Sequence, residues 1–266
     1  MRFKKQVLLL YLTVILLFSF CSCSVEKESS LPTLIIGCDD YESYNYTDAD
    51  GDPAGLDVEL AREACARMGY EPVFRQIKWD ERDTLLETGE IDCLWSCYSM
   101  DDQEERYAWV GPYMNSRQVV AVLEDSPIHS LSDLKDKTVA VRVGTKAESI
   151  FLKRLDTNIP QVQNVYSLNT LDEIATALRN EYVNAVAGYA AALREILQND
   201  AIAFRFLEED LSHASLGVAF SKNSDPAIRN ALSTAFKEML SDGTTKHILE
   251  GYGVETDKAL GGLAYE

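Results

Sequence analysis

Short apolar runs alternate with segments of helical spacing along most of this chain. Residues 34–38, 73–77 and 91–97 are apolar runs bounded by polar residues or glycine, which is the pattern of buried strands. Residues 60–68 repeat apolar side chains at helical spacing and are followed by Gly69, a common helix terminator. This alternation predicts an α/β fold in which helices cover a mostly parallel sheet.

A second helix is predicted between the second and third strands. Asp80 stands where a helix N-cap is expected, Leu85 and Leu86 supply apolar positions, and Gly89 marks the end.

The pattern starts again in the second half of the chain. Strands are predicted at 138–141 and 183–187, with one helix at 146–155 and another after Thr170. Thr170 and Glu173 form a capping box.

An internal similarity supports two lobes of similar build. Segments 86–92 and 178–184 each begin with leucine. Their last two residues are an aliphatic residue and then Asp92 or Asn184. Two such lobes would enclose a cleft, and clefts between lobes are where small molecules bind.

Three further segments complete the predicted plan. The β-rich segments 117–123 and 216–220 would lead from the first lobe to the second and back. Residues 226–252 have helical spacing and would pack on the first lobe. Two connecting strands would act as a hinge.

The chain begins with the pattern of a secretion signal. Arg2, Lys4 and Lys5 precede an apolar run at 7–20. This run is shorter than the roughly 20 apolar residues that a transmembrane helix needs.

Cys23 is the expected site of lipid attachment, because it follows the small residue Ser22 and an apolar run. Residues 1–22 would then be a lipoprotein-type signal peptide and 23–32 a linker. The protein would be exported and anchored to the outer face of the cytoplasmic membrane. Plain cleavage with release, or an uncleaved anchor, are the alternatives.

The chain is acidic, with a formal net charge of −18 at pH 7, and its leader holds no acidic residue. Such a chain has no electrostatic reason to bind nucleic acid or anionic lipid headgroups. We therefore expect no nucleic-acid partner, and we expect a monomer.

Four cysteines remain beyond the expected anchor: Cys38, Cys65, Cys93 and Cys97. An exported chain can oxidise them. If the first and third strands are neighbours, Cys38 could bridge to Cys93 or Cys97, and buried free thiols are the alternative. A zinc site is not expected, because no histidine lies near this set.

Other motifs point to no metal, cofactor or catalytic residue. Acidic residues at 48, 50, 52 and 59 match a calcium loop in spacing, but Pro53 stands where glycine is needed, so we interpret the segment as a turn. The three histidines are far apart, and no nucleotide-binding loop or nucleophile elbow is present.

Several short motifs follow one another in order between Thr33 and Gly253. They are the strand and acid at 34–40, GLDVELA at 55–61, WD at 79–80, GEID at 89–92, GPY at 111–113, LSDLK at 131–135, VAV at 139–141 and DGT at 242–244. The ordered set resembles the bacterial extracellular solute-binding proteins of family three, the amino-acid-binding group of type II periplasmic binding proteins.

The resemblance implies a two-lobed type II periplasmic-binding-protein fold. Each lobe would be a mostly parallel sheet flanked by helices, and two hinge strands would join them. Residues 33–118 with 217–266 would form lobe 1, and residues 119–216 would form lobe 2.

The resemblance also implies a ligand site. Aromatic side chains would stack on the ligand, an acid would follow the first strand, and a serine-containing loop would bind a carboxylate. The expected ligand-binding residues are Asp39, Tyr41, Tyr44, Trp79, Ser96, Cys97, Ser99, Arg106, Thr145, Lys146 and Tyr189.

Two charged contacts of the family are changed here. Where relatives place an arginine for the ligand's carboxylate, this chain has Gln103 or Glu104, and Arg106 is the nearest arginine. Where they place an aspartate for the ammonium group, this chain has Tyr189. Lys146 is the residue expected to supply the missing positive charge.

These features predict a solute-binding lipoprotein that captures an amino acid or a related small polar solute and presents it to an ABC permease. One alternative is a sensory protein that delivers its solute to a membrane receptor. A second is an exported dehydratase-like enzyme, for which Asp39, Glu42 and Lys146 are the acid–base candidates.

Overall fold

The computed structural model describes residues 31–41, 43–101, 103–153 and 159–263. The predicted signal peptide and Cys23, the predicted site of lipid attachment, lie outside these ranges. No helix within them is both long and apolar enough to cross a membrane.

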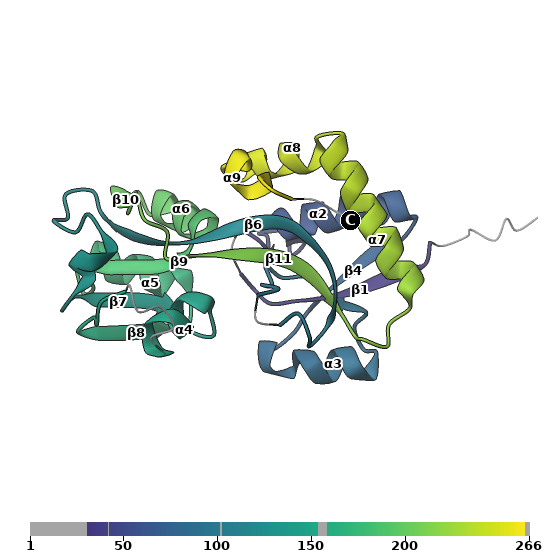
Figure 1. The fold of residues 1–266 in the computed structure, drawn as a ribbon, viewed down its shortest axis with the longest axis horizontal. Coiled ribbons are helices and arrows are strands. Elements are labelled where there is room, and N and C mark those ends of the chain that lie inside the picture. The colour runs from purple at the N-terminus through teal and green to yellow at the C-terminus, as the bar shows by residue number, and fades with distance from the viewer. Residues whose placement is uncertain (1–30, 42, 102, 154–158, 264–266) are drawn as a thin grey trace, which may run out of the picture. The chain divides into compact units, whose positions relative to one another are not determined.

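One sheet runs through the described part of the chain, in the order β4-β1-β5-β11-β6-β9-β7-β8, and β10 pairs with β6 (Figure 1). A two-stranded sheet, β2 with β3, stands apart from it. The strands are β1 (Thr33–Cys38), β2 (Tyr46–Thr47), β3 (Pro53–Ala54), β4 (Glu71–Gln76), β5 (Cys93–Leu94), β6 (Ala108–Leu123), β7 (Thr138–Arg142), β8 (Asn164–Leu168), β9 (Ala185–Tyr189), β10 (Phe204–Phe206) and β11 (Ser212–Phe220).

Helices flank both ends of this sheet. They are α2 (Leu56–Met68), α3 (Arg82–Thr88), α4 (Lys146–Lys153), α5 (Leu171–Arg179), α6 (Ala190–Asn199), α7 (Pro226–Ser241), α8 (Thr244–Gly251) and α9 (Thr256–Leu260), with short 3₁₀ turns at Trp79–Glu81 and Leu131–Leu134.

The sheet has two parallel regions joined by two long antiparallel strands. In lobe 1, which holds β1, β4 and β5 with α2, α3, α7 and α8, strand β1 pairs in parallel with β4 and β5. In lobe 2, which holds β7, β8 and β9 with α4, α5 and α6, strand β7 pairs in parallel with β8 and β9. Strands β6 and β11 pair with each other and pass from one lobe to the other. This is the two-lobed α/β fold with two hinge strands that the sequence predicts.

The observed strands depart from the predicted ones mainly in length. The third predicted strand, 91–97, forms only two residues of ladder as β5, and Cys97 has a positive φ of 39°. A residue in this conformation turns the chain out of the sheet. Residues 96–99 therefore form a loop.

The helix ends follow the glycines. Helix α2 ends at Gly69 and α3 at Gly89, both in the left-handed conformation with φ of 72° and 74°. The predicted N-cap at Asp80 is wrong, because Asp80 lies inside a 3₁₀ turn and α3 is preceded by Glu81, whose side chain makes no cap. The capping box of Thr170 and Glu173 is present at the start of α5.

The internal similarity between the lobes has a structural basis. Asp92 Oδ2 accepts a hydrogen bond from the backbone N–H of Ile35 at 2.7 Å, and Asn184 Oδ1 accepts one from the N–H of Thr138 at 3.0 Å. Each side chain thus satisfies a backbone donor on the neighbouring strand of its own lobe. The shared sequence pattern therefore marks the same packing solution used twice.

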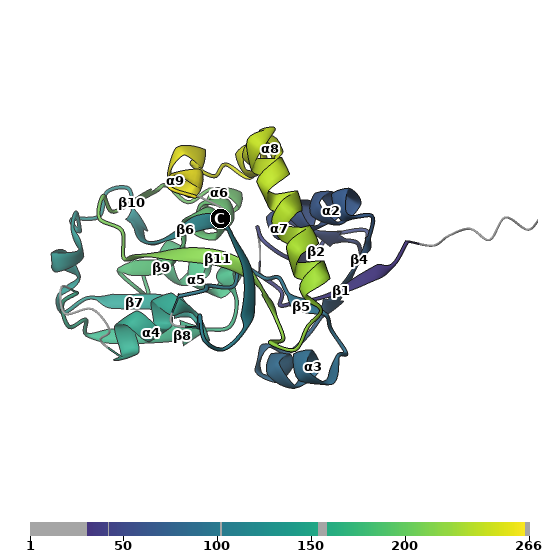
Figure 2. The same cartoon turned by 45° about the vertical axis from the view of Figure 1, so that its right-hand side comes forward.

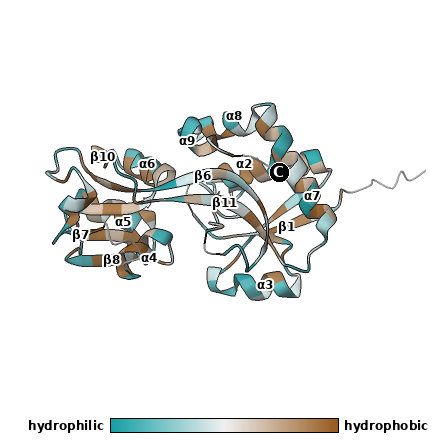
Figure 3. Ribbon diagram, viewed as in Figure 1, coloured by the Kyte–Doolittle hydropathy of each residue, from teal (hydrophilic) through white to brown (hydrophobic). Residues whose placement is uncertain are grey.

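Helix α7 packs against α2 over the sheet of lobe 1 (Figures 1 and 2). Leu60 and Ala64 of α2 and Phe236 and Met239 of α7 are buried and belong to one apolar cluster. The apolar colours gather on inner strands such as β7, whereas α3 is mostly polar (Figure 3). The predicted helical region 226–252 is interrupted between α7 and α8.

Candidate functional site

A cavity of about 700 Å³ is lined by residues of both lobes. Its walls come from the segments that follow β1, β5, β7 and β9 and from the start of α3. The lining residues are Asp39, Tyr41, Trp79, Asp80, Arg82, Ser96, Cys97, Tyr98, Ser99, Asp101, Gln103, Arg142, Val143, Gly144, Thr145, Lys146, Ser149, Lys153 and Tyr189. Ligands of open α/β sheets bind outside the carboxyl ends of the strands, which is where this cavity lies.

Nine of the residues expected at a ligand site line this cavity. They are Asp39, Tyr41, Trp79, Ser96, Cys97, Ser99, Thr145, Lys146 and Tyr189. Tyr44 and Arg106 do not line it.

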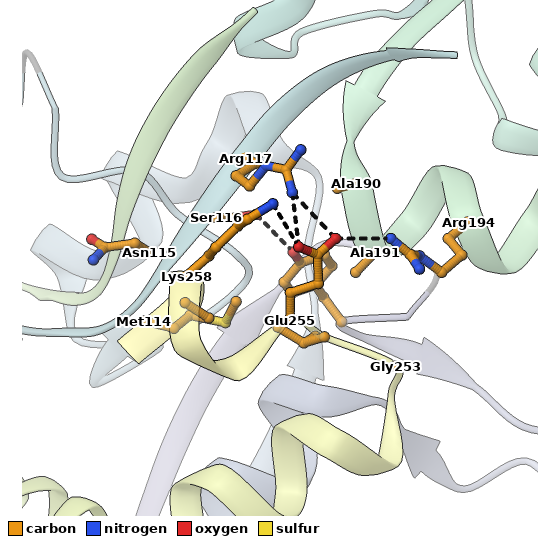
Figure 4. A pocket seen from close by; sticks show the side chains of 13 residues that line it. Met114, Asn115, Ser116, Arg117, Ala190, Ala191, Arg194, Gly253, Glu255 and Lys258 are labelled. Atoms are coloured by element: carbon orange, nitrogen blue, oxygen red, sulfur yellow. Dashed lines mark hydrogen bonds and ion pairs between the residues drawn. The ribbon is translucent and has the colours of Figure 1, made fainter. Parts of the chain in front are cut away.

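Tyr44 lies behind the cavity wall. Its side chain is fully buried, its ring is 6.0 Å from that of Tyr41, and its hydroxyl hydrogen-bonds Ser116 Oγ at 3.0 Å. Tyr44 lines a much smaller cavity of about 30 Å³ instead. Figure 4 shows that cavity beside Ser116 and Arg117 of β6. The position of Tyr44 supports Tyr41 rather than touching the larger cavity.

Arg106 is engaged outside the cavity. Its guanidinium forms an ion pair with Asp83 and lies 5.5 Å from the centre of the Tyr107 ring. Half of its side chain is exposed. The ion pair with Asp83 therefore holds Arg106 away from the cavity.

A buried carboxylate shapes the loop at 96–99. Asp57, in the first turn of α2, accepts hydrogen bonds from the backbone N–H of Cys97 at 2.5 Å, from Tyr113 Oη at 2.8 Å and from Asn45 Nδ2 at 3.1 Å. Burial raises the pKa of Asp57 to about 7, although all three donors favour the charged form. Asp57 is part of the GLDVELA motif, but no feature of that motif predicts that Asp57 would hold this loop.

The loop is also tied to the end of β1. Ser96 Oγ accepts a hydrogen bond from the N–H of Asp39 at 3.0 Å. The carbonyl of Cys97 accepts one from the hydroxyl of Tyr189, in lobe 2, at 3.2 Å. The Tyr189 ring packs edge-on against Tyr41 at 5.8 Å between centroids. Tyr189 thus joins the two lobes at the base of the cavity.

Arg142 is one of several cavity residues that sequence reasoning missed. Its guanidinium lies 4.5 Å from the centre of the Tyr41 ring, and its Nη2 is 3.6 Å from Asp39 Oδ2. Nη2 also donates to the carbonyl of Asp40 at 2.6 Å. Burial raises the pKa of Asp39, and the charge of Arg142 partly opposes that rise. A charged residue closing an otherwise apolar strand was the available signal.

A second guanidinium lies over the other aromatic residue. Arg82 is 5.0 Å from the Trp79 ring and 6.0 Å from the Tyr98 ring, and it donates to the carbonyl of Trp79 at 2.6 Å. Trp79 meets Tyr98 edge-on at 4.9 Å. Gln103 accepts a hydrogen bond from the Tyr98 hydroxyl at 3.1 Å. Trp79 therefore packs against Tyr98 and Arg82 and also lines the cavity.

The lobe 2 wall is a tight loop that leads into α4. Gly144 has a φ of 76°, and its N–H donates to Glu148 at 2.7 Å. Thr145 Oγ1 donates to the carbonyl of Arg142 at 2.7 Å. Lys146 begins the helix. These contacts fix the loop that carries Arg142, Thr145 and Lys146.

The four described cysteines are free and buried. Burial raises the pKa of the Cys38 and Cys65 thiols to about 12 and places those of Cys93 and Cys97 well above the ordinary range. The free-thiol alternative therefore describes this structure, and Cys97 is the thiol that lines the cavity.

The acidic segment after β2 forms a turn, as predicted. Asp48 Oδ1 accepts hydrogen bonds from the N–H groups of Asp50 at 3.0 Å and Asp52 at 2.9 Å. Among the described residues, no group of three or more histidine, cysteine, aspartate or glutamate side chains is arranged to hold a metal ion.

Comparison with protein families decides the wider identity. Residues 34–255 match the model of the bacterial extracellular solute-binding proteins, family 3. The chain belongs to this family. The family's proteins are extracellular or periplasmic, and its type II periplasmic-binding-protein fold agrees with the two lobes described above.

Individual relatives are similar over nearly their whole length. The arginine-binding extracellular protein ArtP of Bacillus subtilis is 24% identical over 90% of this chain and 94% of its own. The histidine-binding periplasmic protein of Salmonella typhimurium is 27% identical over 91% and 96%. The crystal structure of the ancestral amino-acid-binding protein AncCDT-1, described as a precursor of cyclohexadienyl dehydratase, superposes with a TM-score of 0.70 at 25% identity, over 83% of this chain and 94% of that one.

Proposed function

We propose that this family member is an extracytoplasmic lipoprotein that captures an amino acid, or a related small polar solute, for an ABC importer. The observation that carries the proposal is the cavity between β1, β5, β7 and β9. It combines aromatic faces, hydroxyl groups and charges of both signs, contributed by both lobes. A small zwitterionic solute needs this mixture of contacts.

The amino-acid class is supported by the relatives. The similar proteins of Bacillus subtilis and Salmonella typhimurium are named for binding arginine and histidine. Because sequence identity to these relatives is low and the charged contacts differ, we propose the same class of ligand, amino acids, for this chain. We do not propose that it binds the same individual amino acid.

Capture would work by closure of the lobes on the ligand. Asp39, Trp79 and Ser96 belong to lobe 1, and Thr145 and Lys146 belong to lobe 2. A ligand that touches both sets stabilises the closed arrangement by the free energy of the contacts made only there. An ABC permease would recognise the closed form.

The binding proposal is tested by a thermal-shift screen of the full-length chain, unfolded and refolded to strip any carried solute. The panel holds the common amino acids, polyamines, dicarboxylates and short peptides. A ligand at 100 times its dissociation constant should add about 2.7 kcal/mol to the free energy of unfolding. A shift with polyamines or peptides alone would refute the amino-acid class.

The lipoprotein proposal has its own test. Cys23→Ser should move the protein from the membrane fraction to the soluble extracytoplasmic fraction, because the residue expected to carry the lipid is lost. Ser22→Ala, which keeps a small residue before Cys23, is the control. Membrane retention of Cys23→Ser would indicate an uncleaved leader.

The enzyme alternative is favoured by one observation, the likeness to the precursor of a cyclohexadienyl dehydratase. Asp39 and Lys146 line the cavity, and Glu42 lies outside the described residues. Incubation with a cyclohexadienyl acid, followed by NMR, would reveal dehydration. We expect no turnover, since the named relatives are binding proteins.

A sensory role would instead appear as receptor signalling that persists without the permease.

A further inference from the structure

The cavity contains an ion pair that spans the two lobes. Arg142 closes β7 in lobe 2, and Asp39 follows β1 in lobe 1. The nearest nitrogen and oxygen are 3.6 Å apart, beyond the usual hydrogen-bond range of 2.7–3.2 Å. About a third of the Asp39 side chain is exposed. The pair is therefore loose and open to the cavity.

Arg142 is held in place by contacts that leave donors for a ligand. Its Nε donates to the carbonyl of Asn169 at 3.3 Å and its Nη2 to the carbonyl of Asp40 at 2.6 Å. The guanidinium also rests on the Tyr41 ring. A guanidinium has five N–H donors, and these two bonds use two of them. Its planar fork matches a carboxylate better than any other side chain does.

We propose that Arg142 and Asp39 form the head-group clamp of this site, with Arg142 binding the α-carboxylate and Asp39 the α-ammonium of an amino acid. The ligand inserts between the two charges and replaces their loose contact with one close pair on each side. This inference rests on the proposed function and adds the residues that read the solute.

The same geometry sets which side chains the site accepts. The faces of Tyr41 and Trp79 each already carry a guanidinium, from Arg142 and Arg82. A cationic side chain seeking either face would meet a like charge. The site therefore takes amino acids with neutral or acidic side chains and discriminates against arginine and lysine.

The deciding experiment is isothermal titration calorimetry on the full-length chain in mild detergent, stripped by unfolding and refolding. The wild type and Arg142→Gln are titrated with each common amino acid. Arg142→Lys keeps the charge but removes the fork, and it provides a second variant if glutamine disturbs folding. Arg179→Gln is the control, because Arg179 lies on α5, pairs with Asp200 and does not line the cavity.

The wild type should bind at least one neutral or acidic amino acid more than tenfold tighter than arginine or lysine. Arg142→Gln should lower the affinity for that amino acid by about 30-fold, as expected for the loss of a hydrogen-bonded charge. The difference between its affinity and that of arginine should therefore become smaller. Arg142→Lys should fall between, and Arg179→Gln should match the wild type.

Two results would overturn the inference while the proposed function stands: tightest binding of arginine or lysine by the wild type, or unchanged affinity in both Arg142 variants. If the wild type bound no amino acid at all, the proposed function and the clamp would fall together.

Discussion

Asp57 and Cys97, 40 residues apart in sequence, are joined by a 2.5 Å hydrogen bond from the backbone N–H of Cys97 to the Asp57 carboxylate. Both residues are buried, and Cys97 adopts a positive φ. A residue without glycine's freedom pays for this conformation with strain, and the bond to Asp57 helps to hold it there. One carboxylate thus links the core of lobe 1 to the shape of the cavity.

Replacing Asp57 by alanine should cost about 3 kcal/mol of stability or more, because three buried donors, on Cys97, Tyr113 and Asn45, lose their acceptor. Urea denaturation followed by circular dichroism measures the loss. Affinity for the captured solute should fall as well, since the loop at 96–99 is released. An unchanged denaturation midpoint would show that these donors find other partners.

The pKa of Asp57 also predicts a pH dependence. It is raised to about 7, so the folded chain keeps a proton between pH 4 and 7 that the unfolded chain has lost. The contribution of Asp57 to stability is therefore full below pH 4 and declines as pH rises from 4 to 7. Once the pH has passed 7, the loss amounts to up to about 4 kcal/mol.

Asp57→Asn should remove this slope while keeping the fold, since the Tyr113 hydroxyl can accept from the new amide. Unfolding free energies of the wild type and the variant, measured from pH 4 to 8, provide the comparison. Their difference isolates Asp57, because every other titrating group is common to both. Parallel curves would contradict the prediction.

Trp79→Ala should weaken solute binding at least tenfold and leave the fold intact. Trp79 is only partly buried, so its loss costs less packing than the loss of a core residue would, yet the cavity loses an aromatic wall. Calorimetric titration measures the effect. Trp79→Phe keeps a ring and should retain most of the affinity. Equal affinity in Trp79→Ala and the wild type would remove Trp79 from the site.

Lys146→Met should weaken solutes with more than one carboxylate by several-fold and spare those with a neutral side chain. Lys146 lines the lobe 2 wall, and a positive charge there favours an added negative group. Lys135→Met, at an exposed position outside the cavity, is the matched control. Equal losses for both classes of solute would argue against this role.

Glu255→Gln should lower stability at neutral pH by about 0.5–1 kcal/mol. Glu255 pairs with Lys258 at 2.7 Å, with Arg117 on β6 at 3.2 Å and with Arg194 on α6 at 3.3 Å (Figure 4). The expected loss of stability is small because the carboxylate is partly exposed and salt screens its charge.

The pKa of Glu255 is lowered, first by its hydrogen bond to Lys258. Its contribution is therefore present above the unfolded pKa and disappears as pH falls through the folded one. Denaturation midpoints of the wild type and Glu255→Gln should converge at low pH and in high salt. A gap that persists in 1 M salt would point to packing instead of charge.

The sequence predicted the elements whose signal is local. Apolar runs located β1, β4, β7 and β9, and Gly69 and Gly89 located two helix ends, because burial and the left-handed conformation leave marks on single residues. The length of β5 was not predictable in this way. Its early end depends on Cys97 and Asp57, which meet only in the folded chain.

The cavity residues divide along the same line. Most of those expected from the family resemblance line the cavity, because the resemblance fixes where strands end. Arg106 and Tyr44 lie outside it, since Asp83 holds the first and Ser116 the second. Arg142 was overlooked because a charge at a strand end is ambiguous until its neighbours are known.

The place of β11 in the sheet has a consequence for how the chain folds during synthesis. This strand lies between β5 and β6, and its partners on β5 are Cys93 and Leu94. As the chain grows from its N-terminus, β5 waits for a neighbour that arrives more than 120 residues later, at Ala219 and Phe220. Lobe 2, whose elements are contiguous, can assemble first. Lobe 1 must complete its core around a partner already formed, so ribosome-bound chains that stop before β11 should carry an unfinished N-terminal sheet with an open edge.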